Sequence, residues 1–351
     1  MAKDGLPVHV MKFKKIIKGS KKCLVLIAQP LDLDCIASGI LVKKYLESLK
    51  IFAEIYFPRK FTEINKETYK ELPHFGEIKD TNNIKSIIQK GEYDTGIFLD
   101  GTSTIQFFNN SIDETETPDW KHIKKKIKID HHKESNDLLE VDFAFCDEKA
   151  SSTVEILLDT IIPIDILSED LATIAYGGIS SDTGNFSWNF TPKTLRITAK
   201  VLEKGANTDL YTDMFAFSKS REYLDAMSYA IENTEYYEDI NTQVLVLSQK
   251  EFEKIGDRGK INQIKNAFKS SIARKVKGYY RGFVLVEVNP TQIKISGRGN
   301  NYRNKLSIPE IYKKMGASGG GHIQSGGAEI YGNIGEIKQK LLETIRNELS
   351  S

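Results

Sequence analysis

The sequence has few cysteines, almost no net charge and no long apolar run. Its 351 residues include only three cysteines, Cys23, Cys35 and Cys146, and no CxxC pair, which predicts reduced thiols rather than a disulfide framework. The formal net charge of +1 provides no global field that would draw the chain to nucleic acid or an anionic membrane. The absence of a membrane-length apolar segment and of a secretory signal favours a cytoplasmic protein.

The first half of the chain alternates strand-like and helix-like segments. Residues 22–30, KCLVLIAQP, form a continuous apolar run that ends in a turn, as a buried parallel strand does. Residues 36–50 then show helical periodicity, and further strand-like runs follow at 51–57, 93–103, 125–132 and 140–148. This alternation predicts an α/β fold with an N-terminal, mostly parallel sheet that carries helices on both faces.

A second pattern occupies the rest of the chain. Alternating apolar residues at 242–248, 279–288 and 291–299 predict half-buried strands, and residues 308–330 contain a glycine-dense loop. The length suggests about two domains. We therefore predict a first domain over 1–215, a connecting helix over 216–237 and a smaller α/β domain over 238–351.

Acidic and imidazole side chains stand at the ends of the predicted strands. In open parallel sheets ligands bind beyond the carboxyl ends of the strands, so these side chains are expected to gather there. Taken alone, each is typical of a helix cap, a solvated turn or an ordinary histidine, and only the ordered series predicts a site. The series comprises Asp32, Asp34, Asp100, Asp130, His131, His132 and, from a glycine-rich segment, Asp182.

This series of side chains is suited to divalent cations. Clustered carboxylates repel one another unless a cation neutralises them. A mixture of carboxylate and imidazole favours Mn²⁺, Fe²⁺ or Zn²⁺ over Ca²⁺, and an oxygen-rich set favours Mn²⁺ or Mg²⁺. The spacing of Asp32 and Asp34 fits two ions, and two ions about 3.5–4 Å apart form the usual clamp for phosphoester hydrolysis.

In these motifs the chain resembles the DHH/DHHA1 phosphoesterase family, which includes RecJ-like nucleases. The segments LDLDCIASG, FLDGTS, IDHHK and GGISSDTGNFSW resemble its four N-terminal motifs, and ASSTVEILL resembles the helix after the third. In the second domain, SGRG and MGASGGGHIQSGGAEI resemble the substrate-binding DHHA1 module. Domain order and length are most similar to the stand-alone NrnA-type enzymes.

The resemblance implies a role for each matching residue. One Mn²⁺ would be held by Asp34, Asp100, His131 and Asp182, and a second Mn²⁺ by Asp32 and the bridging Asp100. His132 would sit near the scissile phosphate, and Asp130 would orient the imidazoles. The implied substrate contacts are Ser296, Arg298, Gly319, Gly320, Gly321 and His322.

One position departs from the family pattern. The family has a histidine four residues before the first aspartate of LDLD, where this chain has Ala28. The neighbouring Gln29 is a weak substitute for imidazole, so the first metal position is expected to lose a ligand. Cys35 could offer a thiolate, but its place on the first helical turn favours packing.

The resemblance implies a cytoplasmic Mn²⁺-dependent phosphodiesterase that hydrolyses short nucleotides with water activated by two metals. Candidate substrates are cyclic di-AMP, pApA and other nanoRNA, and pAp, and the second domain would clamp them. Homodimers are common in the family. Two alternatives stay open, namely an inorganic pyrophosphatase and a catalytically weakened nucleotide-binding protein that results from Ala28. Basic residues in the second domain offer a local phosphate-binding face: Arg274, Lys277, Arg281, Arg298 and Arg303.

Overall fold

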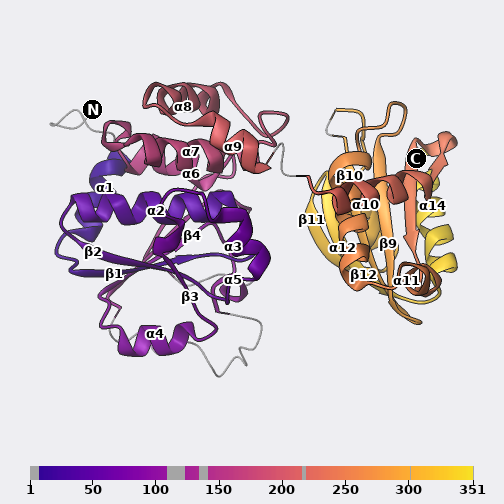
Figure 1. Ribbon diagram of the computed structural model, residues 1–351, viewed down its shortest axis with the longest axis horizontal. Helices are drawn as coiled ribbons and strands as arrows, with labels where there is room; N and C mark the ends of the chain where they lie inside the picture. The colour runs from indigo at the N-terminus through magenta and orange to yellow at the C-terminus, as the bar shows by residue number, and fades with distance from the viewer. Residues whose placement is uncertain (1–7, 109–122, 134–140, 216–218, 301, 351) are drawn as a thin grey trace. The chain divides into compact units, whose positions relative to one another are not determined.

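The computed structural model describes residues 8–108, 123–133, 141–215, 219–300 and 302–350, except for the side chains of 8–12, 215 and 322. The chain divides into two compact units, Met1–Phe217 and Ser218–Ser351, which we call the first and second units (Figure 1). Each unit is built on its own six-stranded sheet. Within the described part of the chain, no helix combines the length and the apolar character that a membrane span requires.

The first unit contains a parallel sheet with the strand order β3-β2-β1-β4-β5-β6. All the residues of β1 after the first, and all those of β4, are buried, which explains their continuous apolar sequences. The strands are β1 (Lys22–Ile27), β2 (Phe52–Phe57), β3 (Ile78–Asp80), β4 (Thr95–Leu99), β5 (Lys125–Asp130) and β6 (Phe143–Cys146).

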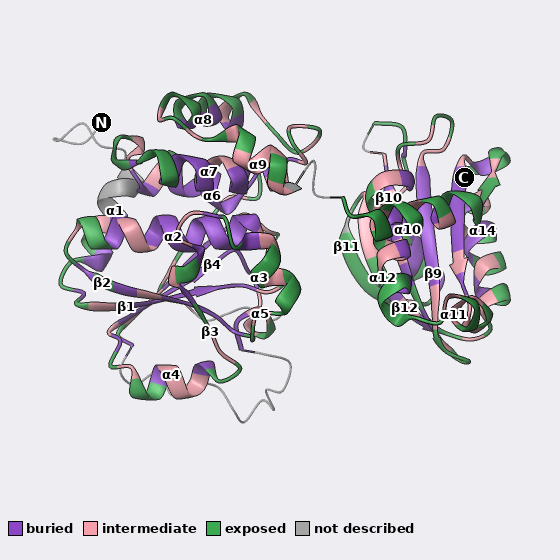
Figure 2. Cartoon of the chain, in the orientation of Figure 1, coloured by how far each residue is buried: buried purple, intermediate pink, exposed green. Residues whose placement is uncertain are grey.

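Helices cover both faces of this sheet, as the sequence predicts. Helices α2 and α7 lie on one side and α4 lies on the other (Figure 1). Figure 2 shows that α2 is almost wholly buried between the sheet and the outer helices. The helices are α1 (Val8–Ile17), α2 (Leu33–Ser48), α3 (Glu63–Tyr69), α4 (Ile84–Lys90), α5 (Thr104–Phe108), α6 (Thr153–Ile156, continued by a π-helical turn), α7 (Glu169–Asp182), α8 (Pro192–Glu203) and α9 (Thr208–Phe215).

Three helix boundaries in the first unit follow from local sequence signals. Ser168 caps α7, and its side chain accepts a hydrogen bond from the N–H of Leu171. Helix α8 starts with Pro192 at its first turn, and Gly205, with a φ of +85°, follows its end. A serine cap, a proline in the first turn and a glycine after the last turn are common start and stop signals of helices.

The second unit is a mixed sheet in the order β11-β12-β10-β9-β8-β7, in which only the β8–β9 pair is parallel. Neighbouring residues of β9 face opposite sides: Phe283 and Leu285 enter one core and Val284 the other. The strands are β7 (Thr234–Tyr237), β8 (Thr242–Leu247), β9 (Arg281–Asn289), β10 (Gln292–Gly299), β11 (Ser318–His322) and β12 (Ser325–Tyr331).

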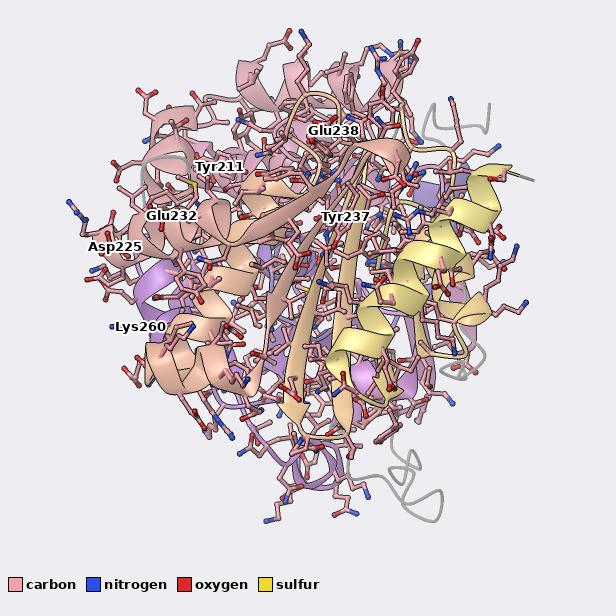
Figure 3. All side chains as sticks on the ribbon, turned by 90° about the vertical axis from the view of Figure 1, so that its right-hand side faces the viewer. Tyr211, Asp225, Glu232, Tyr237, Glu238 and Lys260 are labelled. Atoms are coloured by element: carbon pink, nitrogen blue, oxygen red, sulfur yellow. The ribbon has the colours of Figure 1, made fainter. Side chains whose placement is uncertain are left out.

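Helices cover both faces of the second sheet. Helices α13 (Ile308–Lys314) and α14 (Ile334–Ser350) close one core, and α10 (Arg221–Glu232) and α12 (Arg258–Ala267) close the other, with α11 (Gln249–Ile255) packed beside them. Figure 3 shows Asp225 and Glu232 of α10 and Lys260 of α12 pointing outward from this unit.

Two sequence expectations differ from the structure in the second unit. The predicted connecting segment, 216–237, contains α10 and β7, and both pack within the second unit. The predicted glycine-dense loop forms the antiparallel strands β11 and β12. A Cβ at Gly319 would lie 2.2 Å from the carbonyl oxygen of Gly327, so the glycines allow two backbones to approach more closely than side chains permit.

Candidate metal centre

The carboxyl ends of β1, β4 and β5 bring the predicted acidic and imidazole residues to one edge of the first sheet. These strands are neighbours in the sheet, so the segments that follow them lie side by side. Asp32 and Asp34 follow β1, Asp100 follows β4, and His131 follows Asp130, the last residue of β5. Asp182, the last residue of α7, joins the cluster from a different layer.

Asp34 is fully buried and is fixed by the start of another helix. Its two carboxylate oxygens accept hydrogen bonds from the backbone N–H groups of Thr153, at 2.6 Å, and Val154, at 3.0 Å. These are the first residues of α6, where free N–H groups and the helix dipole favour an anion. The Asp34 carboxylate is therefore oriented before any ligand binds.

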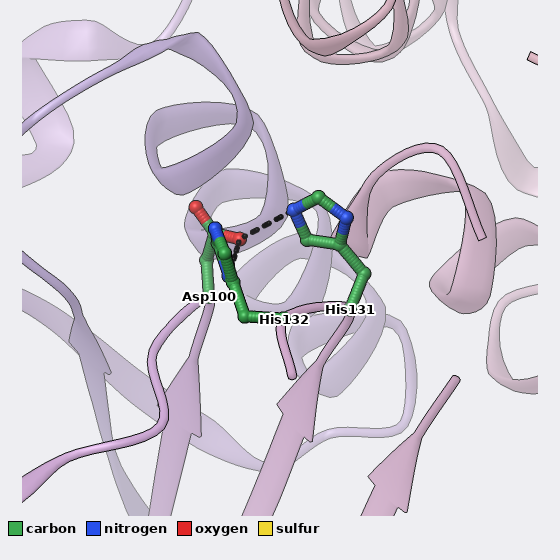
Figure 4. Close-up of side chains that lie close together, drawn as sticks. All are labelled: Asp100, His131 and His132. Carbon is green, nitrogen blue, oxygen red and sulfur yellow. Dashed lines mark ion pairs between the residues drawn. The ribbon is translucent and has the colours of Figure 1, made fainter. Parts of the chain in front are cut away.

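Asp100 presents its two oxygens to two different groups of side chains. Oδ1 accepts a hydrogen bond from the hydroxyl of Thr153 at 2.9 Å and lies 3.5 Å from Nε2 of His131 and 3.6 Å from Nδ1 of His132 (Figure 4). Oδ2 lies 3.0 Å from Sγ of Cys35. Asp100 also has a φ of +63°, a backbone conformation that aspartate tolerates better than most residues. This arrangement suits a bridging ligand.

The two histidines have different carboxylate partners. Nε2 of His131 lies 3.1 Å from Oδ2 of Asp182 and 4.0 Å from Oδ2 of Asp34. Nδ1 of His132 lies 2.9 Å from Oδ1 of Asp130, and the same oxygen accepts a hydrogen bond from the backbone N–H of His132 at 3.1 Å. Asp130 therefore anchors His132, whereas the predicted role of this aspartate covered both imidazoles.

Among the described residues, three groups of potential donor atoms fit a metal ion, and within each group all the atoms lie within 4.8 Å of one another. Nε2 of His131 is buried and makes no hydrogen bond of good geometry with the described residues, as expected of a nitrogen that serves as a metal ligand. The donor chemistry fits divalent cations that accept both carboxylate and imidazole. The groups are Asp34, His131 and Asp182; Asp100, His131 and His132; and Asp32, Cys35 and Asp100.

The electrostatics of the cluster also call for cations. Burial and the charges of Asp100 and Asp182 raise the pKa of Asp32 to about 7 and hold the pKa of Asp34 well above its usual range. Burial lowers the pKa of His132, but Asp130 and Asp100 outweigh it and raise that pKa to about 9. Divalent cations among these groups would remove the repulsion that produces the carboxylate shifts.

Ala28 occupies the position where the family pattern has a histidine, and its neighbours contribute differently to the cluster. Ala28 is buried, and its side chain offers no donor atom. The amide nitrogen of Gln29 donates to the carbonyl oxygen of Ile105 at 2.9 Å, so this side chain is engaged elsewhere. Asp32 caps α2 through a hydrogen bond from the N–H of Cys35. Packing was expected to be the role of Cys35, but its sulfur lies among the carboxylates.

In the second unit, the predicted substrate residues lie on two strands of one sheet. Ser296 and Arg298 are on β10, and Gly319, Gly320 and Gly321 are on β11. His322 ends β11, and its side chain lies outside the described residues.

Arg298 belongs to a group of neighbouring cations. Burial, followed by the charges of Arg298 and Lys265, lowers the pKa of Lys269 to about 8, and burial followed by Arg298 also lowers the pKa of Arg274. Arg281, by contrast, is 2% exposed and donates to Oδ1 of Asn304 and the carbonyl oxygen of Ile240. It is a structural residue and not part of an open phosphate-binding face.

Sequence reasoning missed several residues that shape the first-unit cluster. Thr153 contacts both Asp34 and Asp100, and it lies in the segment ASSTVEILL, which resembles a family motif without indicating these contacts. Gly178 lets α7 approach, because a Cβ there would lie 2.8 Å from Cγ2 of Val154 and 3.3 Å from Oδ1 of Asp34. The adjacent glycines before Asp182 were the signal that could have revealed this close approach.

Residues 22–179 match the model of the DHH family, N-terminal domain. Over its whole length the chain is similar to a solved structure of an exopolyphosphatase-related protein from Bacteroides fragilis, with a TM-score of 0.77 and 21% identity. That similarity covers 99% of this chain and 98% of the other, and it establishes a shared fold.

Two curated relatives are similar in sequence. A membrane protein–large ribosomal subunit bL9 fusion protein of Onion yellows phytoplasma is 20% identical over 97% of this chain and 38% of its own length. A probable bifunctional oligoribonuclease and PAP phosphatase NrnA of Streptococcus mutans is 27% identical over 58% of this chain and 62% of its own length. The chain thus spans less than two thirds of either relative.

Proposed function

Because residues 22–179 match the DHH family, N-terminal domain, we propose that the chain is a divalent-metal-dependent phosphoesterase that acts on short nucleotides. The observation that carries the proposal is the position of Asp100, whose two oxygens face two separate groups of donor atoms. Such an arrangement suits two cations that share one carboxylate. The oligoribonuclease and PAP phosphatase activities named for the Streptococcus mutans relative support nucleotides as substrates.

Each acidic or imidazole residue has a proposed role. Asp34, Asp100, His131 and Asp182 would hold one Mn²⁺, and Asp32 and Asp100 would hold the other. Bound cations supply a water nucleophile at neutral pH and stabilise charge on the phosphoryl oxygens. The task of the protein is to fix their positions, and the hydrogen bonds from Thr153 and Val154 hold Asp34 for this purpose.

His132 is the proposed catalytic group beside the scissile phosphate. Asp130 and Asp100 raise its pKa and so favour the protonated imidazole, the form that can donate a hydrogen bond to a phosphoryl oxygen. Asp130 holds the ring through Nδ1, and Nε2 is the nitrogen proposed to face the substrate. A charged imidazole so held stabilises the additional negative charge that develops in the transition state.

The second unit is proposed to bind the nucleotide. Arg298 can grip a phosphate with two parallel hydrogen bonds, and Lys269 and Arg274 add positive charge near it. A Cβ at Gly320 would meet nothing within 4 Å, so a ligand can approach the backbone of β11 at this residue. Gly319 and Gly321 beside it are also proposed contacts. Ser296 and His322 are the further proposed contacts.

The proposal is tested by measuring hydrolysis of cyclic di-AMP, pApA, pAp and inorganic pyrophosphate in parallel, with Mn²⁺ titrated into metal-free protein. We expect cleavage of at least one of the three nucleotides and its complete loss with a chelator. Pyrophosphate hydrolysis without nucleotide cleavage would instead identify an inorganic pyrophosphatase. Nucleotide binding without turnover at saturating Mn²⁺ would identify a binding protein, and either result would overturn the proposal.

A further inference from the structure

The sulfur of Cys35 lies inside the group of atoms proposed to hold the second cation. Sγ is 3.0 Å from Oδ2 of Asp100, and the donor atoms of Asp32, Cys35 and Asp100 all lie within 4.8 Å of one another. Cys35 is 1% exposed. The sulfur therefore belongs to a closed cluster and not to the surface.

The spacing of these atoms fits a shared ion. A zinc ion binds sulfur at about 2.3 Å and carboxylate oxygen at about 2.0–2.2 Å, so two ligands of one ion lie at most about 4.5 Å apart. The donor atoms of Asp32, Cys35 and Asp100 all lie within 4.8 Å of one another, and Sγ of Cys35 and Oδ2 of Asp100, 3.0 Å apart, are already within this range. Asp32 and Asp100 come from different strand ends, and Cys35 lies between them at the first turn of α2.

Ala28 and Gln29, the residues at the departure from the family pattern, do not complete this group. Ala28 has only a methyl group, and the amide of Gln29 is bonded to Ile105. Cys35 is also close to three oxygens that compete for one thiol proton, since the carbonyl oxygens of Ala28 and Pro30 lie 3.3 and 3.9 Å from Sγ. A cation bound here would reduce the repulsion between the lone pairs of these oxygens and those of the buried sulfur.

We propose that the Cys35 thiolate is the third protein ligand of the cation held by Asp32 and Asp100, and that it makes this position favour Zn²⁺ and Co²⁺ over Mn²⁺. The inference rests on the proposed function, because it needs a cation between these carboxylates. On binding, the ion displaces the Sγ proton to solvent, and the thiolate donates an electron pair to the metal. Soft thiolate ligands select Zn²⁺, whereas carboxylate alone suits Mn²⁺.

Cobalt absorption provides the first test. Co²⁺ titrated into metal-free, reduced protein should give a thiolate-to-cobalt charge-transfer band in the near ultraviolet at one of two bound ions. Cys35→Ser should remove the band and weaken binding of that ion at least about 10-fold. Loss of a residue that only hydrogen-bonds to a metal ligand already lowers metal affinity by about this factor. Cys146→Ser, which removes an exposed thiol, is the matched control and should retain the band.

Zinc X-ray absorption on the unaltered protein provides a second test that needs no variant. With two Zn²⁺ bound, we expect one sulfur at about 2.3 Å for every two zinc ions. Bound zinc with only oxygen and nitrogen neighbours, or a cobalt band that persists in Cys35→Ser, would overturn the role of Cys35 and leave the proposed function standing. Failure of the protein to bind any of Mn²⁺, Co²⁺ and Zn²⁺ would overturn the proposed function as well.

Discussion

The hydroxyl of Thr153 donates a hydrogen bond to Oδ1 of Asp100, and the two groups are 2.9 Å apart in the buried part of the cluster. The backbone N–H of the same threonine donates to Asp34. One residue at the start of α6 therefore orients two carboxylates that come from different strand ends. Such support of metal ligands is commonly as important for metal affinity as an individual ligand contact.

Replacing Thr153 with valine is predicted to weaken Mn²⁺ binding. The change keeps the shape and the backbone N–H but removes the hydroxyl, which releases Asp100 and leaves its buried oxygen unsatisfied. We expect a loss of about 10–100-fold in metal affinity, measured by isothermal titration calorimetry. Thr153→Ser retains the hydroxyl and serves as the control, and equal losses in both variants would contradict this role.

Removing either His131 or Asp182 is predicted to lower kcat/KM strongly. Loss of one ligand removes several kcal/mol of charge stabilisation. At about 1.4 kcal/mol per tenfold change, this corresponds to a decrease of about 100-fold or more in kcat/KM. The variants are His131→Ala and Asp182→Ala, assayed with saturating Mn²⁺ and the best nucleotide substrate.

The control for these variants is His74→Asn, which alters a histidine outside the cluster. His74 contacts Glu77 at 2.7 Å and has a φ of +63°, a conformation that asparagine tolerates. This variant should turn over at the rate of the unaltered protein. Normal turnover in either ligand variant would mean that the residue does not hold the metal.

Gly178→Ala is predicted to disturb the site through packing. The new Cβ would lie 2.8 Å from Val154 and 3.0 Å from Ala37, so α7 would have to move. We expect a decrease of about 1–3 kcal/mol in the free energy of unfolding, together with weaker metal binding because α7 carries Asp182. Urea denaturation and metal titration measure the two effects.

The adjacent Gly177 provides a matched control for the packing effect. A Cβ at Gly177 would meet its nearest atom, in Tyr211, at 3.6 Å, an ordinary contact distance. Alanine is favoured over glycine in a helix interior by about 1 kcal/mol, so Gly177→Ala should leave stability unchanged or raise it. Equal destabilisation by both substitutions would contradict the close-packing explanation.

The stability of the second unit is predicted to increase with pH in a defined window because of Lys269. Its pKa falls from 10.5 to about 8, so the folded chain binds fewer protons than the unfolded chain between these values. The cost of the buried charge is fully present below about pH 8 and is relieved as the pH rises toward 10.5. Lys269→Met should therefore be more stable than the unaltered protein at pH 7, with a difference that shrinks across this window.

Lys269→Arg distinguishes a charge effect from an effect of side-chain shape. Arginine stays protonated throughout the window, so the relief with rising pH should be absent in this variant. Urea denaturation at several pH values between 7 and 10 measures the three proteins. A stability difference between Lys269→Met and the unaltered protein that is independent of pH would contradict the assignment.

Much of the first unit could be predicted from the sequence because strand burial and helix capping are local signals. The apolar runs identified the buried strands of the parallel sheet, and the rule that ligands bind beyond the carboxyl ends of such strands brought Asp34, Asp100 and His131 together. Asp182 reaches the same cluster from the end of a helix, and Cys35 reaches it from a helical turn, and the rule covers neither residue.

What the sequence could not predict depends on distances between segments far apart in the chain. Cys35 occupies a helical turn that usually packs, and only the position of Asp100 shows that its sulfur meets a carboxylate. The glycines of 318–327 resemble a loop by composition, and only their pairing partners make them strands. The connecting segment contains α10, whose helical periodicity alone could not indicate which core it joins.

The proposed ligands come from successive crossovers of the first sheet, and this has a consequence for biosynthesis. Asp32 and Asp34 are made long before Asp182, and no neighbouring pair of strands in this sheet is joined by a hairpin. A growing polypeptide thus carries the early acids without a cavity to receive an ion. Cation capture should occur late in synthesis, and the energy it releases would reinforce the assembled unit as a whole.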